Sequence, residues 1–87
     1  MNIRYFTRVD DNPNSDTYGQ PLSLHRWTED NGHNTLERLD KTAGKWVPNP
    51  SLVAATGVGG ADNYQAVDRD AAAAFLKRAN LPASLLP

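Results

Sequence analysis

Serine, histidine and aspartate occur together in the first half of the chain, as Ser23, His25 and Asp40. A serine nucleophile beside a histidine base and an orienting acid is the arrangement that serine hydrolases use. The strand pairing derived below would place the three side chains on one face of a sheet, with Asp40 opposite Ser23 and only diagonal to His25. Because this order puts the acid beside the wrong partner, and nothing nearby suggests an oxyanion hole, we do not expect an enzyme.

A calcium site is a second candidate in the polar stretch that precedes these residues. Asp10, Asn12 and Asn14 have the opening spacing of an EF-hand loop. The match then fails, since Ser15 stands where glycine is needed and Pro21 stands where a bidentate glutamate should be. We therefore expect a solvated loop and no bound calcium.

Two further patterns invite a ligand-binding interpretation. Gly57-Val58-Gly59-Gly60 could bring backbone amides close to a phosphate, but it does not follow a buried strand and open directly into a helix. His25 and His33 would lie several residue pairs apart, and two imidazoles alone do not make a metal site. We expect a flexible connector at the glycines, no cofactor, and no small-molecule substrate.

The stretch 22–48, which would position most of these side chains, predicts two linked β-hairpins. Asn31-Gly32 supplies the positive φ angles of a two-residue type I′ turn, and this turn fixes the register of the flanking strands. The first hairpin then pairs Asp30 with His33, Thr28 with Thr35, Trp27 with Leu36, Arg26 with Glu37, His25 with Arg38 and Leu24 with Leu39. A second turn at 41–44 pairs Leu39 with Trp46 and Arg38 with Val47.

The flanking segments complete the fold. Residues 3–9 are rich in β-branched and aromatic residues and predict another strand. Residues 51–56 predict a short helix that ends at Gly57, and 63–66 predict an extended segment. We expect an α+β fold, a small antiparallel β-meander of about four strands with C-terminal helices packed on one face. It forms a single domain over 1–87, with the sheet at 3–47 and the helical part at 49–86.

The clearest helix begins after Asp68, whose carboxylate can accept hydrogen bonds from the first turn. Its apolar stripe must pack on the sheet, and we expect Phe75 and Leu76 to be its most buried residues. Leu81-Pro82 should end the helix, and the apolar tail at Leu85-Leu86 can pack back on the domain. The residues of the stripe are Ala72, Phe75, Leu76 and Ala79.

Composition limits the classes of function. The chain has 87 residues, nine Lys and Arg against ten Asp and Glu, and no cysteine. The near-zero net charge gives no global attraction to nucleic acid or to an anionic membrane, and the lack of thiols excludes disulfides and thiolate metal sites. The stretch from Met1 to Arg4 lacks the apolar run of a signal peptide, and no stretch approaches the roughly 20 apolar residues of a membrane helix, so we expect neither. We expect a soluble, intracellular protein without membrane contact.

Apolar residues occupy both faces of the predicted hairpins. One face collects Leu22, Leu24, Leu39 and Trp46. A single helical layer covers one face of a sheet, so the other faces water or a partner unless the first loop or the Leu85-Leu86 tail folds over it. We predict that this second face binds a protein partner or a second copy of the chain. Its proposed partner-binding residues are Trp27, Leu36, Val47, His25 and Arg38.

Nucleic-acid binding is a less favoured interpretation of the same region. Arginines interleaved with aromatic residues on a sheet can neutralise phosphates and stack bases. The alternative is that these arginines pair with acidic residues across the sheet, and the near-neutral chain favours it. The residues concerned are Arg4, Phe6, Arg8, Trp27 and Arg38.

Several short stretches between residues 22 and 75 carry a family signal: Arg26-Trp27, Leu36 to Asp40, Gly44 to Val47, Thr56 to Gly60, and the helix start from Asp68 to Phe75. Their order resembles that in small uncharacterised accessory proteins of actinobacterial phages and prophages. The resemblance implies a phage-type accessory protein. From it and the apolar second face together, we expect the protein to act on a host or phage protein, in the host cytoplasm or in a virion. The resemblance assigns no catalytic or binding residue. A structural or decoration component of a virion is the alternative function, and a nucleic-acid-binding protein is the third.

Overall fold

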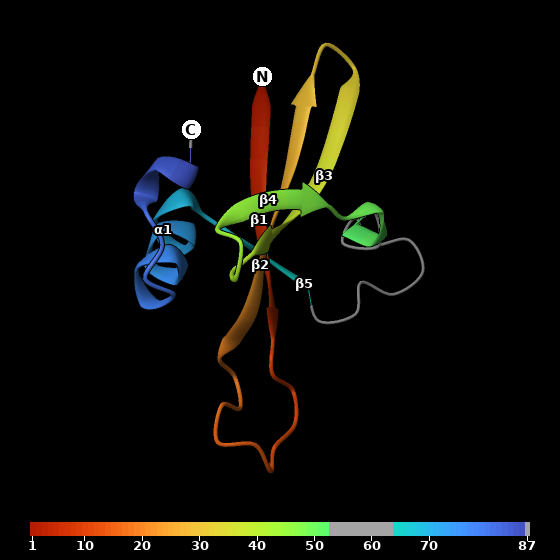
Figure 1. Ribbon diagram of the computed structural model, residues 1–87. Helices are drawn as coiled ribbons and strands as arrows, with labels where there is room; N and C mark the ends of the chain where they lie inside the picture. The colour runs from red at the N-terminus through yellow and green to blue at the C-terminus, as the bar shows by residue number, and fades with distance from the viewer. Residues whose placement is uncertain (53–63, 87) are drawn as a thin grey trace.

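The structure, a computed structural model, describes residues 1–52 and 64–86. It is an α+β fold in which a five-stranded antiparallel sheet carries helix α1 on one face (Figure 1). The strands lie in the order β4-β3-β2-β1-β5. Their bounds are β1 (Asn2–Val9), β2 (Pro21–Asp30), β3 (His33–Asp40), β4 (Lys45–Pro48) and β5 (Tyr64–Val67), followed by α1 (Arg69–Arg78) and the short 3-10 helix η2 (Ala83–Leu85).

The predicted register of the two hairpins is confirmed. Asn31 and Gly32 adopt φ angles of 51° and 79°, as a type I′ turn requires. Trp27 is paired with Leu36, and across the second turn Leu39 is paired with Trp46. Because the side-chain period of a strand is two residues, this register decides which side chains face α1.

The sheet has one strand more than the meander of about four strands that the sequence predicts. The extended segment expected at 63–66 forms β5, which pairs antiparallel with β1 from Tyr5↔Val67 to Arg8↔Tyr64. An unpaired β1 would expose a row of backbone amides and carbonyls along its outer edge. β5 covers that edge over half of its length and leads the chain directly into α1.

Leu22, which the sequence placed on the same face as Leu24, lies at a β-bulge and is largely exposed. The β1–β2 register shifts between Arg8, paired with Ser23, and Val9, paired with Pro21. Leu22 is therefore the extra residue of β2, and a bulge re-aims the side chains around it. Its side chain is 48 % exposed, whereas Leu24 is fully buried.

Helix α1 begins as predicted and ends on a motif that the sequence analysis missed. The Asp68 carboxylate accepts a hydrogen bond of 2.8 Å from the Ala71 amide. At the other end Asn80 adopts a left-handed φ of 59°, and the Leu81 amide donates to the Leu76 carbonyl at 2.9 Å. This is a Schellman motif with asparagine in place of the usual glycine. The helix therefore stops before Leu81-Pro82.

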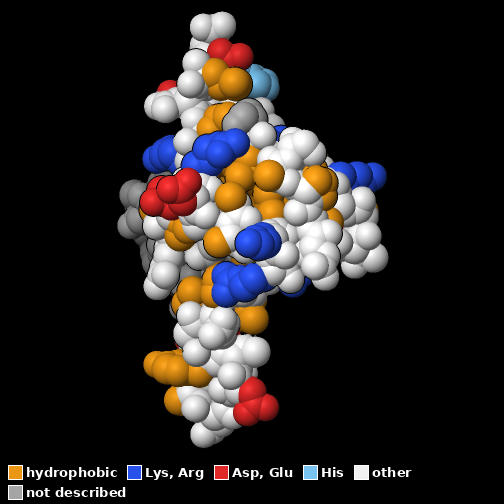
Figure 2. All heavy atoms as spheres, turned by 90° about the vertical axis from the view of Figure 1, so that its left-hand side faces the viewer, with side chains coloured by type: hydrophobic (Ala, Val, Ile, Leu, Met, Phe, Trp, Pro, Cys, Tyr) orange, Lys and Arg blue, Asp and Glu red, His pale blue; other side chains and the backbone are white. Residues whose placement is uncertain are grey.

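The core lies between α1, the C-terminal tail and the inner face of the sheet. Phe75 and Leu76 are buried, as predicted, and Ala72 is buried with them. Figure 2 views the molecule from the α1 side, where Lys and Arg side chains lie among apolar ones. The buried cluster consists of Tyr5, Leu24, Leu39, Ala72, Phe75, Leu76 and Leu86.

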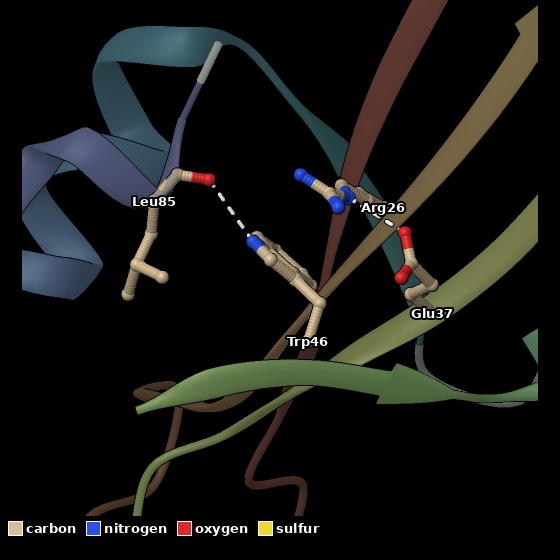
Figure 3. A network of polar contacts seen from close by, with 4 residues as sticks. All are labelled: Arg26, Glu37, Trp46 and Leu85. Carbon is tan, nitrogen blue, oxygen red and sulfur yellow. Dashed lines mark hydrogen bonds and ion pairs between the residues drawn. The ribbon is translucent and has the colours of Figure 1, made fainter. Parts of the chain in front are cut away.

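The C-terminal tail is tied to the sheet by a polar chain (Figure 3). The Trp46 indole donates a hydrogen bond of 3.0 Å to the carbonyl of Leu85. The Arg26 guanidinium lies 4.4 Å from the centroid of the Trp46 ring and forms an ion pair of 2.8 Å with Glu37. The tail thus packs on the same sheet face as α1, which fulfils the expectation that it returns to the domain.

Other expectations fall partly outside the described residues. A short 3-10 turn begins at Pro50 and continues to Leu52, where the description stops. The helix predicted over 51–56, its stop at Gly57 and the connector at Gly57 to Gly60 therefore lie largely or wholly beyond it. Within the described residues, no helix is long and apolar enough to cross a membrane.

Replacing Phe75 by alanine should destabilise the domain by about 3–5 kcal/mol, because it leaves a cavity between α1 and the sheet. That loss is comparable to the whole stability of many small domains. Lys77→Ala, on the exposed side of the same helix, should change stability by no more than about 0.5 kcal/mol. Urea unfolding of both variants measures the difference. A Phe75→Ala midpoint close to that of the unaltered protein would show that α1 does not hold the core.

Candidate functional site

The sheet face opposite α1, which we call the open face, carries the residues to which the sequence assigns a binding role. The strand pairings arrange its side chains in two cross-strand rows. The first row joins Arg4, Trp27 and Leu36, and the second joins Phe6, His25, Arg38 and Val47.

The first row is held in place by polar contacts but remains accessible. Trp27 and Leu36 are partly exposed, and Arg4 is exposed. The Trp27 indole donates a hydrogen bond of 2.9 Å to the Asn34 side-chain carbonyl, and the Arg4 guanidinium lies 4.8 Å from the centroid of its ring. These contacts restrict the rotamer of a large aromatic side chain at the surface.

The second row is covered at its centre. His25 is only 3 % exposed and Phe6 only 5 %. The His25 and Tyr64 rings pack in a T-shaped arrangement, at a centroid distance of 5.0 Å and an interplanar angle of 83°. The turn that follows β4 lies on this side of the sheet (Figure 1), and its residues Asn49 and Leu52 are buried. The segment after β4, rather than the Leu85-Leu86 tail, therefore reaches the open face.

Ser23, His25 and Asn49 form a hydrogen-bonded chain at the covered end of this face. Ser23 Oγ lies 2.7 Å from His25 Nε2, and His25 Nδ1 lies 2.6 Å from Asn49 Oδ1. An amide oxygen can only accept, so Nδ1 carries the proton and donates to Asn49. In the neutral ring Nε2 is then unprotonated and accepts the hydroxyl proton of Ser23. The Asn49 amide nitrogen donates in turn to Ser51 Oγ at 2.9 Å.

The electrostatics of the site keep this histidine neutral. Burial lowers the pKa of His25 below its ordinary value, and the positive charges of Arg8 and Arg38 lower it further, against an opposing effect of the hydrogen bond with Asn49. A neutral imidazole with a free Nε2 lone pair is the form that can take a proton from a hydroxyl group.

The sequence placed Asp40 diagonal to His25 as a possible acid partner. In the structure the partner of His25 is a different residue, Asn49. The Asp40 carboxylate accepts hydrogen bonds from the amides of Thr42 and Ala43, at 3.0 and 3.1 Å, and so caps its own turn. Asn49, in the turn that follows β4, occupies the orienting position beside His25. No local pattern could have revealed this contact, since it joins residues that are 24 positions apart.

The polar loop between β1 and β2 is organised by Asp10. Its carboxylate accepts hydrogen bonds from the Asn12 amide at 3.0 Å and from the Thr17 hydroxyl at 2.6 Å. Hydrogen bonds from Ser15, Thr17 and Asn12 lower the pKa of Asp10. Asp10, the first residue of the possible calcium loop, is thus hydrogen-bonded within its own loop. The described part of the chain contains no cluster of three potential His, Cys, Asp or Glu metal ligands.

The five predicted partner-binding residues therefore divide into two groups. Trp27, Leu36 and Val47 are partly exposed and Arg38 is exposed, whereas His25 is buried and engaged by Ser23 and Asn49. We leave His25 out of the binding surface and add Arg4, which lies against Trp27. We call the surface formed by Arg4, Trp27, Leu36, Arg38 and Val47 the Trp27 patch.

Comparisons of the chain with protein-family models, with curated proteins and with solved structures give no match. Function is therefore inferred from the geometry and chemistry of the two parts of the open face.

The lowered pKa of His25 makes stability depend on pH. The unfolded chain binds a proton at His25 below about pH 6.5, whereas the folded protein resists protonation there. The stabilisation is thus complete above that pH and is lost as pH falls toward the folded-state pKa, with a limiting slope of about 1.4 kcal/mol per pH unit. His25→Gln should flatten this part of the profile. Equal slopes for both proteins, measured by urea unfolding between pH 7 and pH 5, would contradict the assignment.

Proposed function

We propose that the protein is a protein-binding module, an accessory protein of the phage or prophage kind, that engages a host or phage protein through the Trp27 patch. This role requires no catalysis. The observation that carries it is that Trp27 is partly exposed while Asn34 and Arg4 hold its ring in place. Tryptophan and arginine are the residues most enriched at the energetic centres of interfaces.

The fixed position of the Trp27 ring favours binding for an entropic reason. Ordering a flexible side chain in an interface costs about 0.5–1.5 kcal/mol, and a ring already held by neighbours avoids most of that cost. Its surroundings also suit a protein interface, since Leu36 and Val47 supply apolar area while Arg4 and Arg38 supply a polar rim.

The turn after β4 also favours the end of the open face that carries Trp27 as the binding region. Asn49 and Leu52 are buried at the covered end. The backbone amide of Asn49 donates a hydrogen bond of 2.8 Å to the backbone carbonyl of Leu36. Leu36 is therefore positioned by its neighbours on both sides, through pairing with Trp27 and through this contact. The patch lies on strands β1 to β4, each of which is paired with the next in the sheet, and this favours a defined partner surface over an adaptable one.

Single-stranded nucleic acid is a second candidate ligand, because two arginine–aromatic pairs lie on the same face. The Arg4 guanidinium lies over Trp27, and that of Arg8 lies 5.4 Å from the centroid of the Tyr64 ring. Paired cations and aromatic rings on a sheet can bind phosphates and stack bases. Affinity for an oligonucleotide that falls steeply with salt and is lost in Arg8→Gln would favour this ligand over a protein.

Replacing Trp27 by alanine should weaken binding to the partner, or self-association, by about 2 kcal/mol or more, the scale of an interface hot spot. It should destabilise the fold much less than Phe75→Ala does, because the ring lies at the surface. Tyr18→Ala is the matched control, since Tyr18 is 59 % exposed but lies in the loop before β2.

Three measurements on these variants test the proposal. Sedimentation over a range of concentrations detects self-association, and titration against a partner captured from host lysate gives the change in affinity. Thermal melts separate a loss of binding from a loss of fold. The proposal is wrong if Trp27→Ala unfolds the domain, or if it binds the partner as tightly as Tyr18→Ala does.

A further inference from the structure

The covered end of the open face opens into a pocket that the binding role does not use. Its volume is about 330 Å³, at the small end of the range for ligand sites. Ser23 is partly exposed there and is the cross-strand partner of Arg8. The lining consists of Arg8, Val9, Asp10, Asp11, Leu22 and Ser23.

The polarity of the hydrogen-bonded chain prepares Ser23 for attack on an electrophile. His25 Nδ1 donates to Asn49, so Nε2 faces Ser23 Oγ with its lone pair, at 2.7 Å. A serine hydroxyl is a weak nucleophile unless a positioned base removes its proton as the new bond forms. Asn49 thus selects the tautomer of His25 that a general base requires, as the third member of a catalytic triad does.

The lining of the pocket indicates the class of substrate. Val9 and Leu22 offer apolar contacts for a small acyl group, and Arg8, whose guanidinium lies over the Tyr64 ring, adds positive charge to the lining. Positive charge near the pocket favours an oxyanion that forms on a carbonyl attacked by Ser23. The carboxylates of Asp10 and Asp11 disfavour a substrate that is itself anionic.

From this geometry we propose that Ser23 is a nucleophile toward small uncharged carboxylic esters, with His25 as its general base. Ser23 Oγ forms a bond to the carbonyl carbon while its proton passes to His25 Nε2. The bond from that carbon to the ester oxygen then breaks, and the leaving alcohol takes the proton from His25. Water attacks the resulting acyl-serine by the same route in reverse, which releases a carboxylic acid and restores Ser23.

Acylation by p-nitrophenyl acetate tests the nucleophile directly. Mass spectrometry of proteolytic peptides should find an acetyl group on Ser23 during turnover, and no such adduct should form in Ser23→Ala. His25→Gln should slow formation of the adduct by about 100-fold, the lower end of the usual contribution of a general base. Ser84→Ala is the matched control, because Ser84 is exposed in η2 and should leave acylation of Ser23 unchanged.

Asn49 acts as a positioning residue, and its role has a separate readout. Arg8 on β1, Arg38 on β3 and the Tyr64 ring on β5 also face His25. In Asn49→Asp a carboxylate should stabilise the imidazolium against the two arginines, so the acid limb of the acylation rate should move to higher pH. A merely structural role for Asn49 would lower the rate without moving that limb.

The outcomes separate this reactivity from nonspecific acylation. Acetylation of Ser23 that is fast in the unaltered protein and slow in folded His25→Gln supports the proposal. Acetyl groups found only on lysines, on His33 or on other serines overturn it, as does equal labelling of Ser23 in both proteins. Thermal melts establish that each variant is folded.

Discussion

The register of the β2–β3 hairpin is the constraint on which the rest of the structure depends. Asn31 and Gly32 take up the positive φ angles of a tight turn, and every pair along the two strands follows from it. A slip of one residue would turn one of the two strands over relative to the other. If β2 turned over, Leu24 would leave the core and Trp27 would be brought under α1; if β3 turned over, Leu39 would leave the core. The core and the Trp27 patch are therefore two results of one local geometry.

A single long-range contact gives the two ends of the open face different properties. The bond between His25 and Asn49 holds the turn after β4 against the sheet, at the end where His25 and Phe6 are buried. Trp27 lies beyond the reach of that turn and stays accessible. One end of the face can consequently present a surface to a large partner, whereas the other encloses polar groups beside a small pocket. Burial at the covered end strengthens the electrostatic effects on its side chains, because water screens them less.

Features encoded by neighbouring residues could be predicted from the sequence, and those that depend on distant contacts could not. The hairpin register and the Asp68 cap each follow from a few adjacent residues. The place of β5 beside β1 and the partner of His25 depend on how remote segments meet, for which the chain carries no local pattern. The exposure of Leu22 could not be predicted, because alternation assumes a regular strand and the bulge interrupts it. Asn80 could have been found, since asparagine just after a helical stripe often adopts the left-handed conformation.

The two tryptophans of the chain, Trp27 and Trp46, lie on opposite faces of the same sheet and have different neighbours. Trp46 contacts the C-terminal tail and Arg26, so its fluorescence would report whether the tail is docked. Trp27 contacts Arg4 and Asn34 at the surface, so its emission would respond to a ligand on the open face. Variants with one tryptophan each would turn the protein into a pair of separate optical sensors, one for the integrity of the core and one for occupancy of the open face.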